Sequence, residues 1–167
     1  GIEKVSLSSI IFDDPDLIRQ VADKFGSQSV VVTIDVKKDL WRRYRVFREN
    51  GRKKTGYAPE KICQEVERLG AGEIVINSID RDGSYLGYDL ELIRRISGSV
   101  DIPVVSCGGA SKIEDFEKAI SSGASAVAAG SFFVAGSVSS AARLKLGVKN
   151  TSVSAATQAA FQCRFVL

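Results

Sequence analysis

Short β-branched apolar runs alternate with amphipathic stretches from Val5 to Ser131, and this alternation constrains the fold of the 167-residue chain more than any other feature. The run Val30–Ile34 is β-branched at every position, as a strand buried on both faces requires. The amphipathic stretches have the spacing of helices with one apolar face. The pattern therefore predicts βα units arranged around a parallel sheet.

We predict five strands and four intervening helices here, or about 26 residues per unit, which is typical of a (β/α)8 TIM barrel. The strands are expected at Val5–Ser8, Val30–Ile34, Glu73–Ser78, Pro103–Ser106 and Ala126–Gly130, and the helices at Pro15–Phe25, Pro59–Leu69, Asp89–Ser97 and Lys112–Ser121. Asp14 is expected to cap the first helix, and Ser111 with Glu114 fits a capping box for the last. Five strands cannot close an eight-stranded barrel, so the predicted fold class is α/β, a partial TIM barrel.

A basic excursion separates the second strand from the second helix. Tyr44–Phe47 and the residues after Asn50-Gly51 suggest a hairpin, because Asn-Gly supplies the positive φ angles of a two-residue turn. Residues 37–54 hold nine basic and two acidic side chains, a charge that suits an anionic substrate or a nucleic acid. Few aromatic residues interleave, so a solvated basic rim is favoured and no nucleic acid is expected.

Two compositional features exclude classes of chemistry. The chain has no histidine, which excludes Ser-His and Cys-His nucleophiles and leaves carboxylates as the main candidates for proton transfer. Cys63, Cys107 and Cys163 are far apart, so neither a disulfide framework nor a zinc site is expected. With no long apolar run and no signal-peptide pattern, the expectation is a soluble cytoplasmic protein without membrane contact.

The residues that follow each strand are small, polar and rich in glycine. In parallel α/β folds these loops carry function, and barrels often bind phosphate after their last two strands. Gly108 and Gly109 allow close approach of a ligand to the backbone, and the next helix would aim its N-terminus at that point. Together with Gly130 and Ser131 they predict half of a phosphate cradle. The alternative is that the glycines only permit tight turns.

Three carboxylates follow predicted strands: Asp35 after one strand, and Asp80 and Asp82 after the next. Asp35 follows an apolar strand and could both take and give a proton, or it could cap a helix or pair with a neighbouring lysine. Because no helix is predicted nearby, catalysis is favoured. Asp80 and Asp82 precede Gly83 and could bind a metal or shape the loop. We predict no metal site and no cofactor.

Several motifs together resemble one known family, the cyclase subunit of imidazole glycerol phosphate synthase (HisF family). They are Lys4-Val5-Ser6, FGSQ at 25–28, GRKKTG at 51–56, ERLGAGE at 67–73, SIDRDGS at 78–84, GYDLE at 87–91 and SCGGA at 106–110. The resemblance extends from Gly1 to about Val134 and corresponds to barrel strands four to eight. It divides the chain into a partial phosphate-binding barrel, residues 1–134, and a divergent tail of unknown structure, residues 135–167.

The resemblance implies an activity and roles for several residues. In that family, ammonia from a glutamine amidotransferase (glutaminase) partner passes through the barrel and attacks a phosphoribulosyl aminoimidazole carboxamide nucleotide, giving imidazole glycerol phosphate for histidine biosynthesis. Asp35 would be one of two catalytic aspartates, the other belonging to a first strand that this chain lacks. Lys4 and Glu73 would belong to the gate where ammonia enters. One substrate phosphate would be held by Asp82, Gly83, Gly108, Gly109, Gly130 and Ser131.

Other interpretations remain open at this point. The region from Asp35 to Tyr57 looks closer to a paralogous branch that supplies ammonia for acetamidino groups on surface-polysaccharide sugars. The sibling sugar isomerase of the histidine pathway fits less well, because the sequence from Ser78 to Gly83 resembles the cyclase more. A third interpretation is an inactive barrel fragment that keeps one phosphate site.

Overall fold

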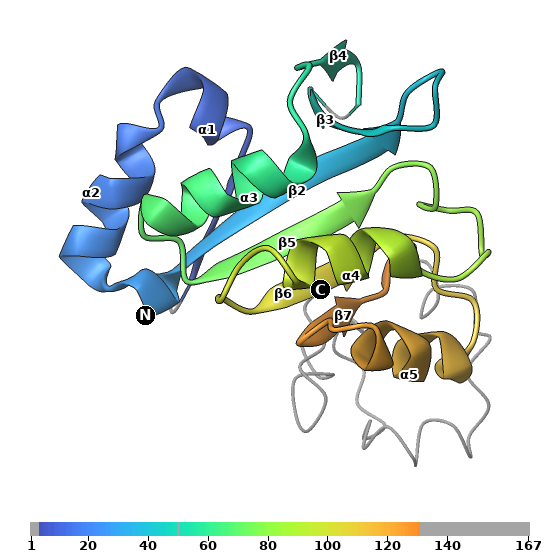
Figure 1. The fold of residues 1–167 in the computed structure, drawn as a ribbon. Helices are drawn as coiled ribbons and strands as arrows, with labels where there is room; N and C mark the ends of the chain where they lie inside the picture. Colours follow the sequence, from blue (N-terminus) through green and yellow to red (C-terminus); the bar gives the residue numbers. More distant parts are fainter. Residues whose placement is uncertain (1–3, 50, 131–167) are drawn as a thin grey trace.

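Five parallel strands form one curved sheet in the computed structural model, which describes residues 4–49 and 51–130 (Figure 1). Their spatial order follows the chain: β1 (Val5–Ser8), β2 (Val30–Lys38), β5 (Glu73–Ser78), β6 (Val104–Cys107) and β7 (Ala126–Ala128). Neighbours in sequence are neighbours in space, as in the wall of a barrel. The predicted partial TIM barrel is therefore confirmed. Ser131 and the tail at 135–167 lie outside the described residues.

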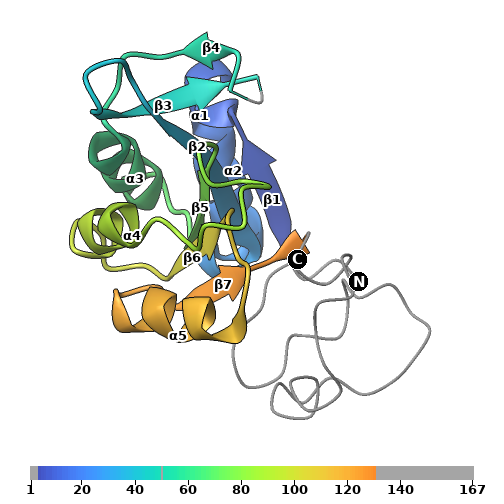
Figure 2. The same cartoon turned by 90° about the vertical axis from the view of Figure 1, so that its right-hand side faces the viewer.

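Helices connect the parallel strands and cover one face of the sheet. They are α1 (Ile10–Asp13), α2 (Asp16–Phe25), the 3-10 helix η1 (Ser27–Ser29), α3 (Pro59–Arg68), α4 (Leu90–Ser97) and α5 (Ile113–Ser121). Figure 2 shows α3, α4 and α5 on the same side of the curved sheet. No helix in the described part of the chain is long and apolar enough to span a bilayer. The four predicted crossover helices are thus present, and α1 is an additional short one.

The two faces of the sheet carry different side chains. Residues at alternate positions of β2 and β5, such as Val32, Ile34 and Ile76, pack in one buried cluster with Ile18 of α2 and Val66 of α3. Since side chains alternate along a strand, the remaining positions face away from the helices. We call this second side the inner face; its residues on β2, β5, β6 and β7 are Val31, Thr33, Asp35, Glu73, Val75, Asn77, Val105, Cys107, Ala126 and Ala128.

The predicted hairpin is present, with two corrections. β3 (Tyr44–Arg48) pairs antiparallel with residues 35–38 of β2, so β2 continues to Lys38 instead of ending before Asp35. β4 (Lys53–Lys54) pairs with β3, and the last pair of the ladder is Arg48–Lys53. The connection is therefore longer than the predicted two-residue turn; Asn50 lies outside the described residues.

Both predicted helix caps are wrong by one residue. α2 begins at Asp16, and Pro15 rather than Asp14 occupies its N-cap. At α5 the N-cap is Lys112, which makes Asp115 the third helical residue. Its carboxylate Oδ2 accepts hydrogen bonds from the N–H groups of Ser111 and Lys112 and from the Ser111 hydroxyl, at 3.0, 3.1 and 2.8 Å. Glu114, which the predicted capping box assigns to this role, is exposed.

Candidate functional site

A polar pair lies on the inner face where the parallel strands end. Asp35 of β2 is in register with Asn77 of β5, and Asn77 with Cys107 of β6. The Asn77 side chain donates a hydrogen bond from Nδ2 to Asp35 Oδ1 at 2.8 Å. Because an ionised carboxylate only accepts, the amide nitrogen is the end that faces Asp35. The sequence analysis missed Asn77, although an amide in the apolar run of β5 was an available signal.

The turn after β6 packs against the loop after β5 through its two glycines. A Cβ atom at Gly108 would lie 2.8 Å from the Ser78 carbonyl oxygen and 3.3 Å from the Asp82 nitrogen. A Cβ atom at Gly109 would lie 2.4 Å from the Gly87 carbonyl oxygen. Both have positive φ angles, +93° and +102°. These contacts require glycine whether or not an anion binds, so the tight-turn interpretation accounts for them by itself.

The remaining predicted phosphate residues surround this turn. The Asp82 N–H donates to the Ser78 carbonyl at 2.9 Å, which fixes the start of the β5–α4 loop. Gly83 and Gly130 are exposed, and a Cβ atom at either would meet no atom within 4 Å. The structure therefore brings Asp82, Gly108 and Gly109 together at the edge that carries Asp35. Ser131 is outside the described residues.

Cys107 lies on the inner face, in register with Asn77. Burial raises the pKa of the Cys107 thiol, and the negative charges of Asp82 and Asp35 raise it further. A thiol with a raised pKa is a poor nucleophile at neutral pH, so Cys107 is not a candidate for covalent catalysis.

Asp80 has a structural partner. Its Oδ2 accepts a hydrogen bond from the N–H of Lys38 at 2.8 Å, which ties the β5–α4 loop to the end of β2. Of the two roles left open by the sequence, metal binding and loop shaping, this contact favours the second.

The opposite end of the inner face carries the predicted gate residues. Lys4 Nζ lies 2.7 Å from Glu73 Oε2, and the Glu73 side chain is only 5% exposed. Glu73 Oε1 is buried and has no hydrogen-bond partner among residues 4–49 and 51–130. Val31 pairs with Glu73, and Asp35 is four residues further along β2, which places the two sites about 13 Å apart.

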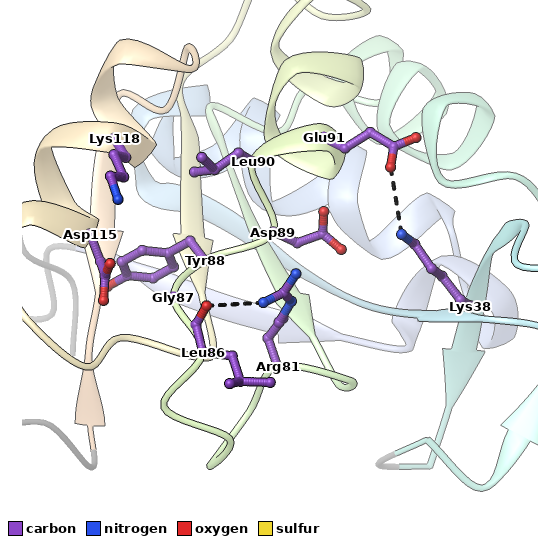
Figure 3. A pocket seen from close by; sticks show the side chains of 10 residues that line it. All are labelled: Lys38, Arg81, Leu86, Gly87, Tyr88, Asp89, Leu90, Glu91, Asp115 and Lys118. Carbon is purple, nitrogen blue, oxygen red and sulfur yellow. Dashed lines mark hydrogen bonds and ion pairs between the residues drawn. The ribbon is translucent and has the colours of Figure 1, made fainter.

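A separate cavity of about 320 Å³ lies between the β5–α4 loop and the starts of α4 and α5 (Figure 3). Side chains of both charges line it, including Lys38, Arg81, Glu91 and Asp115. Lys38 Nζ pairs with Glu91 Oε2 at 3.5 Å, and Arg81 donates to the Leu86 carbonyl. Neither Asp35 nor Gly108 lines the cavity. The sequence did not predict it, because its walls come from three separate segments.

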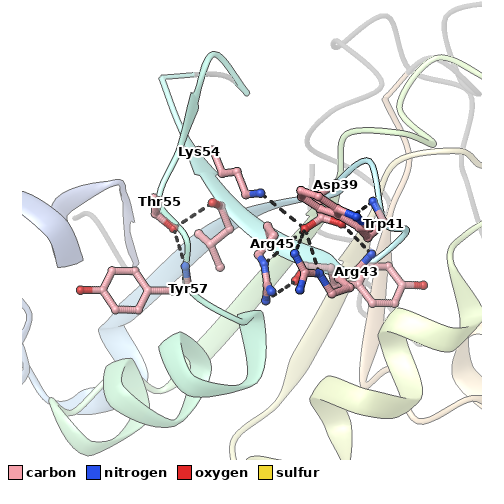
Figure 4. Close-up of polar contacts among 9 residues, drawn as sticks. Asp39, Trp41, Arg43, Arg45, Lys54, Thr55 and Tyr57 are labelled. Carbon is pink, nitrogen blue, oxygen red and sulfur yellow. Dashed lines mark hydrogen bonds and ion pairs between the residues drawn. The ribbon is translucent and has the colours of Figure 1, made fainter.

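The basic hairpin is organised around one buried carboxylate (Figure 4). The Asp39 side chain is 4% exposed and accepts hydrogen bonds from the N–H groups of Trp41 and Arg43 and from the side chains of Arg43 and Lys54. Burial opposes the charge, but these bonds and the charge of Arg43 lower the pKa of Asp39 to about 2. Part of the predicted solvated rim is therefore an ion-paired cluster, which the count of charges could not reveal.

Comparison with known proteins gives one consistent result. Residues 1–139 match the family described as "Histidine biosynthesis protein". The chain is 50% identical over 135 residues to the imidazole glycerol phosphate synthase subunit HisF of Pyrobaculum aerophilum, covering 80% of this chain and 52% of that protein. It is 48% identical over 138 residues to the putative imidazole glycerol phosphate synthase subunit hisF2 of Pseudomonas aeruginosa, covering 80% and 54%.

A third relative extends the same pattern. The HisF subunit of Endomicrobium trichonymphae is 47% identical over 133 residues, covering 80% of this chain and 51% of that protein. The chain spans about half the length of these curated relatives. The resemblance inferred from the motifs is confirmed: this chain belongs to the histidine biosynthesis protein family and is a relative of its HisF subunits.

Proposed function

We propose that the protein is the cyclase subunit of an imidazole glycerol phosphate synthase. The substrate would be a phosphoribulosyl aminoimidazole carboxamide nucleotide, which reacts with ammonia to give imidazole glycerol phosphate. One observation carries the proposal: the Asp35–Asn77 pair and the Gly108–Asp82 turn lie at the same end of the inner face. A proton carrier and an anion-binding turn at one sheet edge suit a phosphorylated substrate whose reaction needs proton transfer.

The turns would hold one substrate phosphate. Asp82, Gly83, Gly108, Gly109, Gly130 and Ser131 form this proposed set. Positive φ angles at Gly83, Gly108 and Gly109 open the backbone to close approach, and α5 begins five residues after Gly108. The N–H groups of Ser111 and Lys112 already donate to Asp115, so α5 would contribute through the positive end of its dipole, which favours a phosphate. Asp35 would then move protons at the part of the substrate that lies over the inner face.

Lys4 and Glu73 would serve as an ammonia gate for a glutaminase partner. Their ion pair lies at the end of the inner face opposite Asp35, so ammonia entering there would travel along the strands to the reacting atoms. Lys4→Ala should lower glutamine-dependent turnover in the full-length enzyme while leaving turnover with added ammonium unchanged. An equal loss with both nitrogen sources would contradict this role.

The activity itself is tested with the full-length gene product. The purified protein is supplied with the nucleotide and ammonium, and the imidazole product is measured. Formation of that product, together with rescue of a histidine auxotroph by the gene, is the expected result. Absence of product with active nucleotide present would contradict the proposal and would favour another acceptor of ammonia, such as a sugar precursor.

We also propose that residues 1–134 form the barrel part of this chain and that residues 135–167 do not belong to it. The 167-residue chain alone should then show little cyclase turnover, because the second aspartate implied by the family resemblance is not in it. Turnover by the purified 167-residue chain at the rate of the full-length enzyme would contradict this expectation.

A further inference from the structure

The amide of Asn77 is hydrogen-bonded to the proposed proton carrier. Its Nδ2 donates to Asp35 Oδ1 at 2.8 Å, so one carboxylate oxygen is engaged. Within residues 4–49 and 51–130 no group hydrogen-bonds to Oδ2, which is therefore available to a substrate. Asp35 itself is partly buried in the interior of β2, not on a mobile loop. An oriented carboxylate with one free oxygen can exchange protons with a substrate in a single geometry.

The other end of the amide faces the proposed phosphate turn. A Cβ atom at Gly108 would lie 3.4 Å from Asn77 Oδ1, which places this oxygen against the turn that also contacts Asp82. Asn77 Oδ1 is buried and has no hydrogen-bond partner in the described part of the chain. A purely structural asparagine in a buried position is expected to satisfy both ends of its amide. In Asn77 the Nδ2 end of the amide, which faces Asp35, is hydrogen-bonded, and the Oδ1 end is not.

We propose that Asn77 is a positioning residue that holds the Asp35 carboxylate in its reactive orientation beside the Gly108 turn. The catalytic part of this inference, that the orientation is the reactive one, rests on the proposed function. The geometric part, that Asn77 fixes the orientation of the Asp35 carboxylate, does not. The role requires a hydrogen-bond donor at position 77, because Asp35 offers only acceptor atoms when ionised. It also requires a short side chain, since the distance between β2 and β5 is fixed by their ladder.

Two substitutions separate donation from packing. Asn77→Leu has nearly the same size and no donor, whereas Asn77→Thr keeps a donor in a shorter side chain. Ser78→Ala is the matched control, because Ser78 is the next residue of β5, is buried, and points to the opposite face.

Crystal structures of the variants test the geometric part without any substrate. The Asp35 carboxylate should leave its present orientation in Asn77→Leu and keep it in Asn77→Thr and Ser78→Ala. An unchanged Asp35 orientation in well-folded Asn77→Leu would overturn the proposal, even if the cyclase activity is real.

Steady-state kinetics of the full-length enzyme with ammonium test the catalytic part. Asn77→Leu should lower kcat about 10- to 100-fold with the KM for the nucleotide changed by less than about 2-fold, and Asn77→Thr should recover most of the loss. Equal losses in Leu and Thr variants, or a change confined to KM, would overturn the positioning role. A wild-type enzyme without turnover would refute the proposed function. The crystal structures of the variants would still show whether Asn77 orients the Asp35 carboxylate.

Discussion

Gly109→Ala is a substitution for which the structure predicts a large local effect. Gly109 has a φ angle of +102°, a region that costs a residue with a Cβ atom about 1–2 kcal/mol. The added Cβ would also lie 2.4 Å from the Gly87 carbonyl oxygen, and overpacking of this kind costs about 1–3 kcal/mol. The loop cannot simply move away, because the Gly87 N–H donates to the Gly109 carbonyl at 2.8 Å. The expected loss in the free energy of unfolding is about 2–5 kcal/mol.

Urea unfolding with a matched glycine measures this effect. Gly56 also has a positive φ angle, +84°, but a Cβ atom there would meet nothing within 4 Å. Gly56→Ala should therefore lose only the conformational part, about 1–2 kcal/mol. The difference between the two variants isolates the contact with Gly87. Equal losses in Gly109→Ala and Gly56→Ala would refute the close packing of the two turns.

The same variant addresses the proposed phosphate site. Because a hydrogen bond joins the Gly87 loop to the Gly109 turn, the added Cβ must displace the two together, and the backbone N–H groups around Gly108 and Asp82 then lose their mutual arrangement. The KM for the phosphorylated substrate should then rise about 10-fold or more, while Gly56→Ala leaves the KM unchanged. A folded Gly109→Ala enzyme with a wild-type KM would show that this turn does not bind the substrate phosphate.

Three further outcomes follow from particular contacts. Asp115→Ala removes the carboxylate that caps α5 and should lower the unfolding free energy by about 1–2 kcal/mol, whereas Glu114→Ala should lower it by less than about 0.5 kcal/mol. Equal losses in the two variants would contradict the assignment of the cap to Asp115. Burial and hydrogen bonding to Asp89 raise the pKa of Tyr44 in the folded state, so the stabilisation from its protonated hydroxyl is complete below about pH 10 and is lost at higher pH. In urea unfolding at several pH values, Tyr44→Phe should reduce the fall of the unfolding free energy above about pH 10 by about 1.4 kcal/mol per pH unit. The same pH dependence in Tyr44→Phe and wild type would contradict this. The pKa of Asp39 is lowered to about 2, so the stabilisation from its ionised carboxylate is complete above the ordinary aspartate range and is lost as the pH falls toward 2. Asp39→Asn should therefore weaken the dependence of the unfolding free energy on pH in acid. The same acid dependence in Asp39→Asn and wild type would count against the Asp39 cluster.

The alternation of apolar runs was sufficient to predict the parallel strands, since burial on the helix side leaves a clear trace in the sequence. The length of β2 was not predictable in the same way. Residues 35 and 36 pair with both β5 and β3, whereas residues 37 and 38 pair with β3 alone. Such pairing across a turn has no local signal beyond its charged residues. The cap of α5 was missed because the N-cap lies one residue later than the Ser-x-x-Glu pattern suggests, which exchanges Glu114 for Asp115.

The candidate site was predictable to different extents. Asp35 and the glycine turns could be assigned to one sheet edge, because parallel strands end on the same side. The Asn77 contact depends on the register between β2 and β5, which a single sequence does not specify. In the sequence, Asp39 is one of two acidic residues among nine basic ones in residues 37–54. Only the fold shows that its carboxylate forms ion pairs with Arg43, Arg45 and Lys54.

Asp35→Asn tests the central claim most directly, because it removes the proton carrier while keeping its size. Turnover and binding of the nucleotide are measured on the full-length enzyme with ammonium as nitrogen source. We predict a loss of at least about 100-fold in kcat with nucleotide affinity close to wild type, since the phosphate turns are left intact. An Asp35→Asn enzyme that forms imidazole glycerol phosphate at the wild-type rate would contradict the account.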